Sequence, residues 1–577
     1  MLPTVFKNTK NTNNTNKVDK RYLYCIDNPN NIRLANLIGI ICLILAGFGF
    51  LEFLKLNIFY LLFFSPIVLI NLSSNFLGKF INLFYPGFKK ETHINFTNNF
   101  WNNLDEAKVP SVDIFLPIAG EDVKILQKTW KAVSKIEYSN YNVYVLDDKG
   151  DKEAEKLALS FGFSYLSRPN KGEYKKSGNL EHGYKHASGE YVLVLDADFA
   201  PIPTALTEAL PYIVSNPKMS ILQTPQYFDN TKKVHKSSPI QYGAGVVVEE
   251  FYRITQVSKS VFGLSICVGT SAIFRREAVD KVGMPKVDHT EDLRQGLMTM
   301  GEGYYVGYIP LIISEGICPD NLQSYYSQQL RWAYGSIETL FSTFIKQANL
   351  TTWGIVNFVS SALYYLAEAT APLLSLQLLC LLYFNTSSLR ISWVLPFLPY
   401  FIFENFIRPK ILISKSRRGV KIAGLTQMFT YMDGLIRYVI RQPIVWVSTN
   451  AKSAKRQISL NYLTNGTVTL LFSLIYILLF SLILFLKPYI ILNWETYIVL
   501  GLAIYRSFVY ASYSWNLLDF MHLGLIKDLE NKLISGLHFH FWRVTIIILI
   551  FISSAFLLYI IGTNSYSIYY NNYIAIH

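Results

Sequence analysis

The sequence predicts two structural parts, an α/β domain in the middle of the chain and an α-helical membrane domain built from both ends. The chain has 577 residues, of which 51% are hydrophobic and only 16% are charged, a more apolar composition than that of an ordinary soluble domain. Residues 86–350 contain no long apolar run. In this central region short β-rich runs alternate with helical patterns, which is typical of α/β domains.

Apolar runs on both sides of the central region predict membrane-spanning helices. The longer runs reach the roughly 20 residues that cross a bilayer. The expected spans are at residues 37–51, 56–72, 355–384, 393–407, 467–486, 497–513 and 544–561. The run at 393–407 is short and contains Pro396 and Pro399. We therefore expect a multi-pass membrane protein.

Basic residues predict the orientation of these spans. Lys and Arg cluster near the N-terminus, in the central region and at residues 408–421, 452–456 and 527–543, whereas residues 564–577 contain none. The positive-inside bias then places the central domain in the cytosol and the chain in the plasma (inner) membrane. The formal net charge of +13 would otherwise favour nucleic-acid binding. Segments that face anionic lipid account for this charge, so we expect a lipid bilayer as partner and no nucleic acid.

The pattern of the central region predicts an open parallel sheet. β-rich runs at 112–117, 142–147 and 191–196 end in polar or turn residues, and helical patterns at 123–136 and 152–161 separate them. Strands that alternate with helices pair in parallel. Ligands of such sheets bind at the carboxyl ends of the strands.

Two of these strands end in acid pairs, Asp147-Asp148 and Asp196-x-Asp198. Carboxylates at this edge can position the ribose of a nucleotide sugar and hold Mg²⁺ or Mn²⁺, which neutralises charge on a leaving diphosphate. Acid pairs at strand ends are also common as turn and helix-capping residues. The pairs alone therefore leave both interpretations open.

Two further motifs lie toward the end of the central region. Asp292, in the sequence His-Thr-Glu-Asp, is the candidate general base that deprotonates an acceptor hydroxyl, and helix capping is the alternative. In Gln-Gln-Leu-Arg-Trp, Gln328 can hydrogen-bond sugar hydroxyls, Arg331 can neutralise a diphosphate, and Trp332 can stack on a sugar ring. An amphipathic helix at the membrane surface would explain the last motif equally well.

The ordered set of DD, DAD, TED and QxxRW resembles the signature of processive family 2 glycosyltransferases, most closely the bacterial cellulose synthase catalytic subunits. The segments KKSGNLEHG, QTPQYFDN and GTSAIFRR also resemble this family. The resemblance covers roughly residues 110–460. It implies a GT-A (Rossmann-like) cytosolic domain joined to an α-helical transmembrane channel domain. The function implied is an inverting enzyme that polymerises a UDP-sugar, UDP-glucose into β-1,4-glucan (cellulose) in the first instance, and moves the chain across the membrane.

The resemblance also implies residue roles. Asp292 is the base, Asp196 and Asp198 bind the metal, and Gln328, Arg331 and Trp332 form the floor at the channel entrance. The residues implied in substrate binding are Glu121, Asp147, Asp148, Lys176, Asp196, Gln328, Arg331 and Trp332. A gating loop is implied at Trp446, Thr449 and Lys452, where the lysine stands one residue later than in the family.

The expected domain order follows from these assignments. The chain is expected to begin with a disordered tail (1–30) and transmembrane helices (31–85), followed by the glycosyltransferase domain with an interfacial helix (86–350). After it come transmembrane helices (351–410), interfacial helices with the gating loop (411–465) and final transmembrane helices (466–577). The expected partners are a UDP-sugar donor, a growing polysaccharide acceptor, the bilayer and an export partner outside the cytoplasm.

Other functions stay open at this stage. A curdlan-, mannan-, chitin- or hyaluronan-like synthase would share much of the pattern, and so would a non-processive enzyme that adds one sugar to a lipid carrier. A transporter or receptor with a degenerate soluble domain would not need all three acidic sites. The QxxRW motif followed by several spans favours a polymerising enzyme, because a polymer needs a floor and a conduit.

Overall fold

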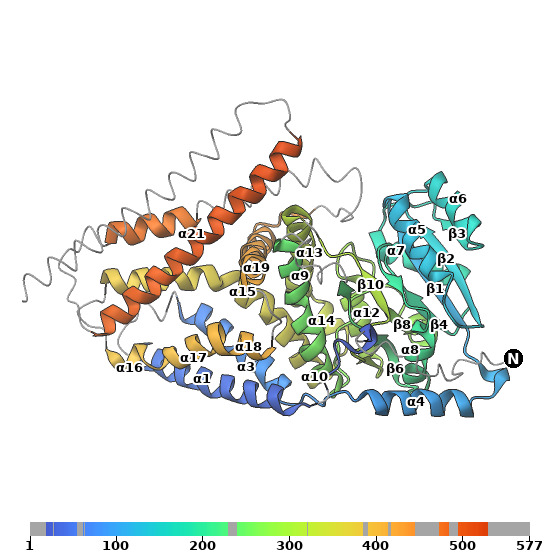
Figure 1. Ribbon diagram of the computed structural model, residues 1–577, viewed down its shortest axis with the longest axis horizontal. Helices are drawn as coiled ribbons and strands as arrows, with labels where there is room; N and C mark the ends of the chain where they lie inside the picture. Colours follow the sequence, from blue (N-terminus) through green and yellow to red (C-terminus); the bar gives the residue numbers. More distant parts are fainter. Residues whose placement is uncertain are drawn as a thin grey trace, which may run out of the picture.

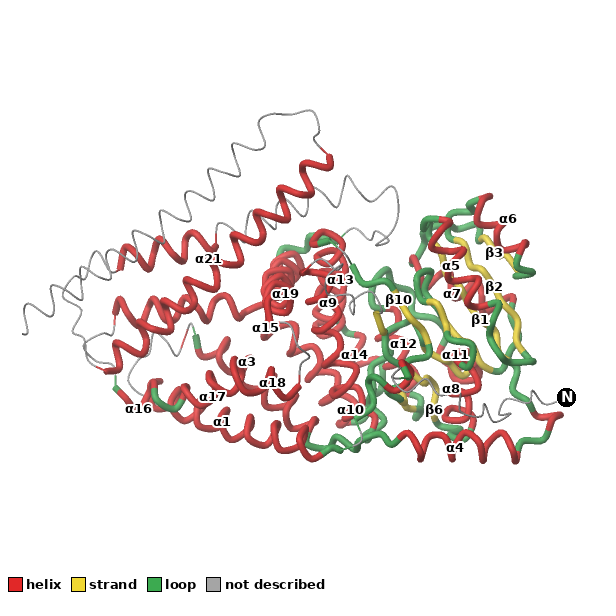
Figure 2. The backbone as a smooth tube through the Cα atoms, viewed as in Figure 1, coloured by secondary structure: helices red, strands yellow, loops and turns green. Residues whose placement is uncertain are grey.

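The computed structural model describes residues 19–26, 28–54, 62, 64–228, 239–319, 321–384, 390–412, 417–444, 472–483 and 494–528. Strands are confined to one end of the molecule and long helices fill the other, as Figures 1 and 2 show. The chain therefore has the two kinds of structure that the sequence predicts, an α/β part and a helical part.

A seven-stranded sheet forms the centre of the α/β part, in the order β3-β2-β1-β4-β8-β6-β9. Its strands are β1 (Val112–Ile118), β2 (Tyr141–Asp147), β3 (Ser164–Ser167), β4 (Tyr191–Val194), β6 (Met219–Gln223), β8 (Ala272–Arg275) and β9 (Tyr305–Tyr308). β1 to β4 pair in parallel, as do β6 and β9. The three predicted strands are present with ends shifted by one or two residues.

The prediction of a wholly parallel sheet is wrong at β8, which is antiparallel to both β4 and β6. The strands β1, β2, β3 and β4 are joined by helical crossovers, and such connections lead to parallel pairing. β8 instead follows an excursion into the helical part through α9 (Pro239–Glu250), η4 (Phe251–Thr255) and α10 (Gln256–Ser260). It therefore re-enters the sheet from the opposite edge.

The sheet has an apolar core on each face. In β1 the side chains of Ile114 and Leu116 belong to one buried cluster, whereas Phe115 belongs to another with Leu146 and Val194. Successive strand residues point to opposite faces. A continuous apolar strand such as β1 is therefore buried on both sides, as expected for a sheet covered by helices on both faces.

Two of the helices of the α/β part, α5 (Val123–Val133) and α6 (Lys152–Ser160), begin at aspartate capping residues. Asp122 accepts from the Lys124 N–H (2.9 Å) and Asp151 from the Glu153 N–H (2.8 Å), each satisfying a free amide of a first turn. The other helices of this part are α4 (Lys90–Asn103), α7 (Lys175–His186), α8 (Ala205–Val214), α11 (Arg276–Val282) and α12 (Glu291–Gly301), with a 3₁₀ turn η2 (Glu106–Lys108) before β1. Both predicted central helices, at 123–136 and 152–161, are confirmed and end earlier than expected.

A small second sheet joins β5 (Ala200–Pro201), β10 (Ser314–Gly316) and β7 (Tyr227–Phe228). It lies toward the helical part (Figure 1). β10 is followed directly by α13 (Leu322–Phe341), so the small sheet leads the chain out of the α/β part.

The helical part packs around α15 and α19. Among the described elements, α15 contacts α3, α13, α19 and α21, and α19 also contacts α9 and α13. The helices not yet given are α1 (Asn30–Leu54), α3 (Ser65–Asn82), α14 (Phe344–Gln347), α15 (Thr352–Phe384), α16 (Ile391–Val394), α17 (Phe397–Ile402), η5 (Phe403–Ile407), α18 (Arg408–Leu412), α19 (Arg417–Val439) and α21 (Trp494–Asp528). Through α13 and α9 this bundle is continuous with the α/β part.

In the part of the chain that the structure describes, two helices are long and apolar enough to cross a membrane, Asn30–Leu54 and Thr352–Tyr383. They coincide with the predicted spans at 37–51 and 355–384. The predicted span at 544–561 lies outside the described residues. Length and composition thus single out α1 and α15, and a multi-pass topology stays a prediction.

Two predicted spans have different bounds in the structure. The run at 393–407 is broken into α16, α17 and the π-helical turn η5. The break between α16 and α17 falls at Pro396, which is the N-cap of α17 and cannot extend α16 as a regular helix. The helix α3 begins at Ser65 with a proline in its first turn and continues to Asn82, beyond the predicted end of the span at 56–72.

Residues 19–26 pack against the α/β part, so this described stretch of the predicted disordered tail (1–30) is structured. They include the 3₁₀ turn η1 (Lys20–Tyr22). Arg21 forms an ion pair with Glu208 on α8, and the Tyr24 ring is buried. These contacts are made with residues distant in sequence, so the polar composition of the tail could not reveal them.

Candidate active site

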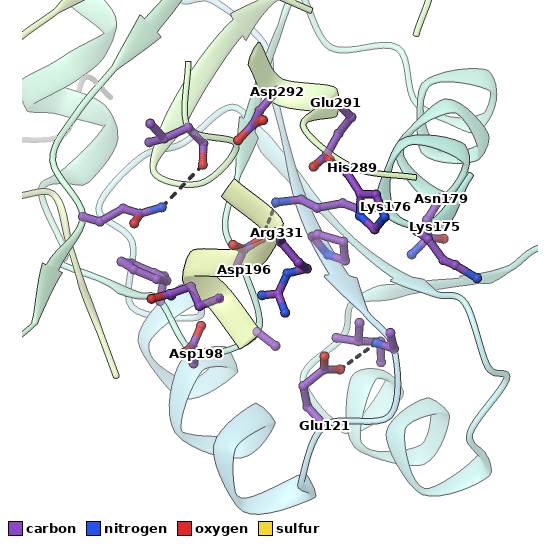
Figure 3. A pocket seen from close by; sticks show the side chains of 18 of the residues that line it. Glu121, Lys175, Lys176, Asn179, Asp196, Asp198, His289, Glu291, Asp292 and Arg331 are labelled. Carbon is purple, nitrogen blue, oxygen red and sulfur yellow. Dashed lines mark hydrogen bonds and ion pairs between the residues drawn. The ribbon is translucent and has the colours of Figure 1, made fainter. Parts of the chain in front are cut away.

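A cavity of about 240 Å³ lies at the carboxyl ends of β1 and β4, where α13 closes it from the side of the helical part. This is the edge at which open α/β sheets bind ligands. Most of the predicted site residues line it together, namely Glu121, Asp148, Lys176, Asp196, Asp198, Asp292, Gln328, Arg331 and Trp332. Figure 3 shows acidic and basic side chains from separate segments of the chain around this one space.

The acid pair after β4, Asp196 and Asp198, lines the cavity. The Asp196 N–H donates to the Thr270 hydroxyl (2.9 Å), which fixes the turn. Asp198 is enclosed, and burial together with the neighbouring Asp196 charge raises the pKa of Asp198 to about 7. Two carboxylates this close in a closed site call for a positive partner.

Lys176, at the start of α7, provides one such positive charge. Its Nζ donates to the Asp196 Oδ1 (2.5 Å) and to the Gly269 carbonyl (2.8 Å), and the first of these contacts is marked in Figure 3. Burial lowers the pKa of Lys176, but the charges of Asp196 and Glu291 outweigh it and raise the pKa above its ordinary value. The ammonium therefore stays charged and can meet a diphosphate.

Glu291 and Asp292 begin helix α12 and face the same cavity (Figure 3). Burial, reinforced by the adjacent Glu291, raises the pKa of Asp292 to about 7. The pKa of Glu291 is raised as well, mainly by burial. A carboxylate with a pKa near 7 is suited to accept a proton from an acceptor hydroxyl, so the environment of Asp292 fits the role of a base.

Helix α13 presents Gln328, Arg331 and Trp332 to the cavity. Burial lowers the pKa of Arg331 to about 10, a value at which the guanidinium remains charged at neutral pH. Trp332 also packs against a large apolar cluster that includes residues of the helical bundle. The indole thus lines the cavity and joins the cluster that extends into the bundle.

Asp147 is a correction to the predicted set, because it does not line the cavity. Its carboxylate is fully buried and accepts from the N–H groups of Lys149 (2.7 Å) and Asp151 (2.6 Å) and from the Tyr165 hydroxyl (2.7 Å). These bonds fold the turn after β2. The capping interpretation of the first acid pair therefore holds for Asp147.

Asp148 lies on the opposite side of that turn and does line the cavity. It accepts from Arg168 Nε (2.6 Å) and from the Gly172 N–H (2.9 Å). One of its neighbours across the cavity is Glu121, whose Oε2 accepts from the Ala119 N–H (2.6 Å), as drawn in Figure 3. Glu121 is thus held in place by the loop that follows β1, and Asp148 by the loop that follows β3.

The lining residues that the sequence analysis missed include Lys175, Asn179 and His289. Lys175 has a left-handed backbone (φ 44°) at the start of α7. Burial lowers the pKa of His289, so its imidazole is neutral near pH 7. Their only sequence signal is adjacency to Lys176 and to the Thr-Glu-Asp motif.

The residues predicted to bind a metal fit a site completed by substrate. Among the described residues there is no group of three or more His, Cys, Asp or Glu side chains arranged around a metal. Asp196 and Asp198 nevertheless offer oxygen ligands in one cavity. Mg²⁺ is commonly bound by one or two carboxylates together with phosphate oxygens and water.

The predicted gating residues Trp446, Thr449 and Lys452 lie outside the described residues.

Comparison with known families identifies the α/β part. Residues 113–283 match the family model described as Glycosyl transferase family 2. This segment forms a family 2 glycosyltransferase domain. The family prediction is thereby confirmed for this domain, which contains the acid pairs and Lys176, whereas Asp292 and Trp332 lie beyond the matched residues.

Curated relatives of the glycosyltransferase domain include cellulose synthase catalytic subunits. That of Komagataeibacter sucrofermentans is 30% identical over 241 residues, which cover 41% of this chain and 32% of the relative. That of Pseudomonas fluorescens is 26% identical over 308 residues, which cover 52% of this chain and 42% of the relative. The chain thus matches less than half the length of each.

Solved structures also resemble this chain. A mannosyltransferase from Pyrobaculum calidifontis, in complex with GDP-Man and Mn²⁺, has a TM-score of 0.43 at 12% identity. The alignment covers 65% of this chain and 100% of the mannosyltransferase chain.

Proposed function

We propose that this chain is a membrane-embedded, processive β-glycosyltransferase that polymerises a UDP-sugar and passes the product into its own helices. The observation that carries the proposal is that Asp292 and Trp332 line the same cavity as Asp196 and Asp198. A donor site, a proton acceptor and an aromatic platform therefore share one space. UDP-glucose polymerised into a β-1,4-glucan is the preferred substrate class, because the curated relatives are cellulose synthase catalytic subunits.

The donor is held by charge and by carboxylates. Lys176 and Arg331 line the cavity and offer charge-assisted hydrogen bonds to a diphosphate. Asp196 and Asp198 would hold a divalent metal, Mg²⁺ or Mn²⁺, which when bound neutralises charge on the leaving diphosphate. Asp148 and Glu121 lie on the side of the cavity next to β1 and β2, and in this proposal the nucleoside of the donor binds on that side.

Transfer is a single displacement. Asp292 removes the proton of an acceptor hydroxyl, and the hydroxyl oxygen forms a bond to the anomeric carbon of the donor sugar. The bond between that carbon and the diphosphate oxygen breaks, and UDP leaves with the electron pair. The proton remains on Asp292, whose pKa near 7 lets it return the proton to solvent.

The acceptor site explains why a polymer is the proposed product. The Trp332 indole lines the cavity and joins the cluster that extends into the helical bundle, and a terminal sugar ring can stack on it there. Stacking tolerates translation along the chain, so a product can advance by one sugar after each addition. A single transfer to a lipid carrier would need the same base but no such platform.

The test is to incubate the purified full chain with a panel of labelled nucleotide sugars and divalent metals, and to measure product length. We expect long polymer from UDP-glucose with Mg²⁺ or Mn²⁺. In Asp292→Asn donor binding should persist while turnover falls by roughly 10²- to 10⁴-fold. Single-sugar products would favour the lipid-linked enzyme, and preference for another donor would favour another polysaccharide synthase. Full turnover in Asp292→Asn would contradict the assigned base.

A further inference from the structure

Two glycines, Gly335 and Gly269, pack against the segment Thr290–Asp292 that contains the candidate base. The first is Gly335, which lies on α13 three residues after Trp332. Its Cα packs directly on the Thr290 side chain. A Cβ built at Gly335 would overlap the Thr290 Cγ2 and lie 2.9 Å from its Oγ1 and 3.2 Å from its Cβ. Any larger residue at this position therefore has to displace either α13 or Thr290.

Thr290 is poorly able to yield to such a displacement. Its backbone is left-handed (φ 55°), a region that a β-branched residue rarely occupies. Its hydroxyl donates to the His289 carbonyl (2.7 Å), and its own carbonyl accepts from the Arg294 N–H (3.1 Å) in the first turn of α12. A shift of Thr290 is therefore transmitted to Asp292, which is in that first turn.

The second position, Gly269, holds the base from the other side. A Cβ at Gly269 would lie 2.9 Å from the Asp292 Oδ2 and 3.0 Å from its Cβ, and the backbone of Gly269 is left-handed (φ 75°). The Gly269 carbonyl accepts from Lys176 Nζ (2.8 Å). The base is thus packed against the same residue that anchors the donor-side lysine.

We propose that Gly335 is a positioning residue for the reaction: its missing side chain lets α13 seat Thr290, and this contact holds Asp292 at the acceptor end of the cavity. The inference rests on the proposed function, because it takes Asp292 as the base. It links the α13 motif to the chemistry through packing, in addition to the direct contacts of Arg331 and Trp332 with the cavity.

The experiment compares Gly335→Ala with a rescue variant. Alanine is a better helix former than glycine, so α13 itself is not weakened. At equal amounts of folded protein, turnover of Gly335→Ala should fall by roughly 10- to 100-fold, the cost of misplacing a catalytic group by about 1 Å, while the KM for the donor stays unchanged. Thr290→Ser removes the overlapping methyl group and keeps the hydroxyl. The double variant Gly335→Ala/Thr290→Ser should regain most of the lost turnover.

Gly434→Ala is the matched control. Gly434 lies on α19 and faces the same helix α13, but a Cβ there would meet its nearest neighbour, Ala333, only at 3.5 Å. This variant should retain wild-type turnover. Unchanged turnover in Gly335→Ala, or a double variant as slow as Gly335→Ala alone, would overturn the positioning role.

A second readout separates this inference from the proposed function. The thermal unfolding of the four proteins in the Gly335 and Thr290 cycle measures the contact without any substrate. We expect non-additive midpoints, with Thr290→Ser less harmful in the Gly335→Ala background than in the wild type. Additive midpoints would overturn the contact even if transfer is observed. A wild type that transfers no sugar, with non-additive midpoints, would overturn the proposed function and leave the packing contact in place.

Discussion

At the scale of single residues, the pH dependence of transfer follows from the pair Glu291 and Asp292. The base must be deprotonated to act, and burial with the Glu291 charge raises the pKa of Asp292 to about 7. Turnover should therefore rise with pH and level off above about 7. Glu291→Gln removes the neighbouring negative charge, so the pKa of Asp292 falls and the acid limb moves to lower pH. The measurement is the pH profile of kcat at saturating donor.

The control for this profile is Glu181→Gln. Glu181 is a partly exposed residue on α7 that pairs with Lys185, outside the cavity lining. Its variant should keep the wild-type profile. An acid limb that stays in place in Glu291→Gln would show that Glu291 does not set the protonation of the base.

Asp198 carries the second residue-scale prediction, on the metal. Asp198→Asn removes one of the two carboxylates offered to the cation, so transfer should be lost and donor binding should no longer respond to Mg²⁺ or Mn²⁺. Calorimetric titration of UDP with and without metal checks this. Asp122→Asn is the matched control, because Asp122 caps α5 nearby and Asn caps as well as Asp. Metal-dependent binding that survives in Asp198→Asn would remove Asp198 from the metal site.

At the scale of elements, the packing of α11 against β1 is stabilised by a buried ion pair. Asp113 is fully buried, accepts from the Gly189 N–H (2.5 Å) and pairs with Arg276 Nη2 (3.0 Å). Asp113→Ala leaves the Arg276 guanidinium without this partner. We expect a loss of about 3–5 kcal/mol in unfolding free energy, seen as a lower midpoint in thermal unfolding of the full chain.

The double variant Asp113→Ala/Arg276→Met tests the cause of that loss. It removes both charges, so it should recover part of the lost stability, because an unpaired buried charge is costlier than an apolar pair. A double variant less stable than Asp113→Ala would mean that the arginine contributes mainly through its other bonds, to the carbonyls of Gly189 and Tyr184.

At the scale of the whole molecule, Trp332 joins the catalytic cavity to the helical bundle. If a product chain stacks on this indole before it leaves the cavity, Trp332→Ala should yield short products while donor binding persists. Trp353→Ala is the matched control, because Trp353 is 65% exposed at the start of α15 and does not line the cavity. Product length at equal folded protein is the measurement. A normal polymer ladder from Trp332→Ala would favour the single-transfer enzyme.

The helices of the helical part could be predicted only in outline. The apolar runs correctly mark α1 and α15 as helices of membrane-spanning length, because hydropathy acts residue by residue. The predicted span at 393–407 is broken before α17, where Pro396 is the N-cap, whereas Pro399 lies inside α17. Whether chain neighbours near prolines form one helix or several depends on packing, which the run of apolar residues does not contain.

The sequence by itself determined the parts of the site that follow from local pattern. Strands β1, β2 and β4, the acid pairs after β2 and β4, and the Thr-Glu-Asp and QxxRW motifs are all recognisable from the order of residues alone, since parallel strands bring their carboxyl ends to one edge. The resemblance of this ordered set to family 2 glycosyltransferases is what assigned Lys176, Asp198 and Asp292 to one predicted ligand.

The tertiary structure alone decided which of two adjacent residues serves which purpose. Asp147 ties a turn and Asp148 lines the cavity, although both stand at the end of the same strand. β8 runs antiparallel because the chain passes through the helical part before it returns. Gly335 meets Thr290 only because α13 closes over α12. In each case a partner distant in sequence makes the difference, and periodicity carries information about the faces of one element but none about what packs against them.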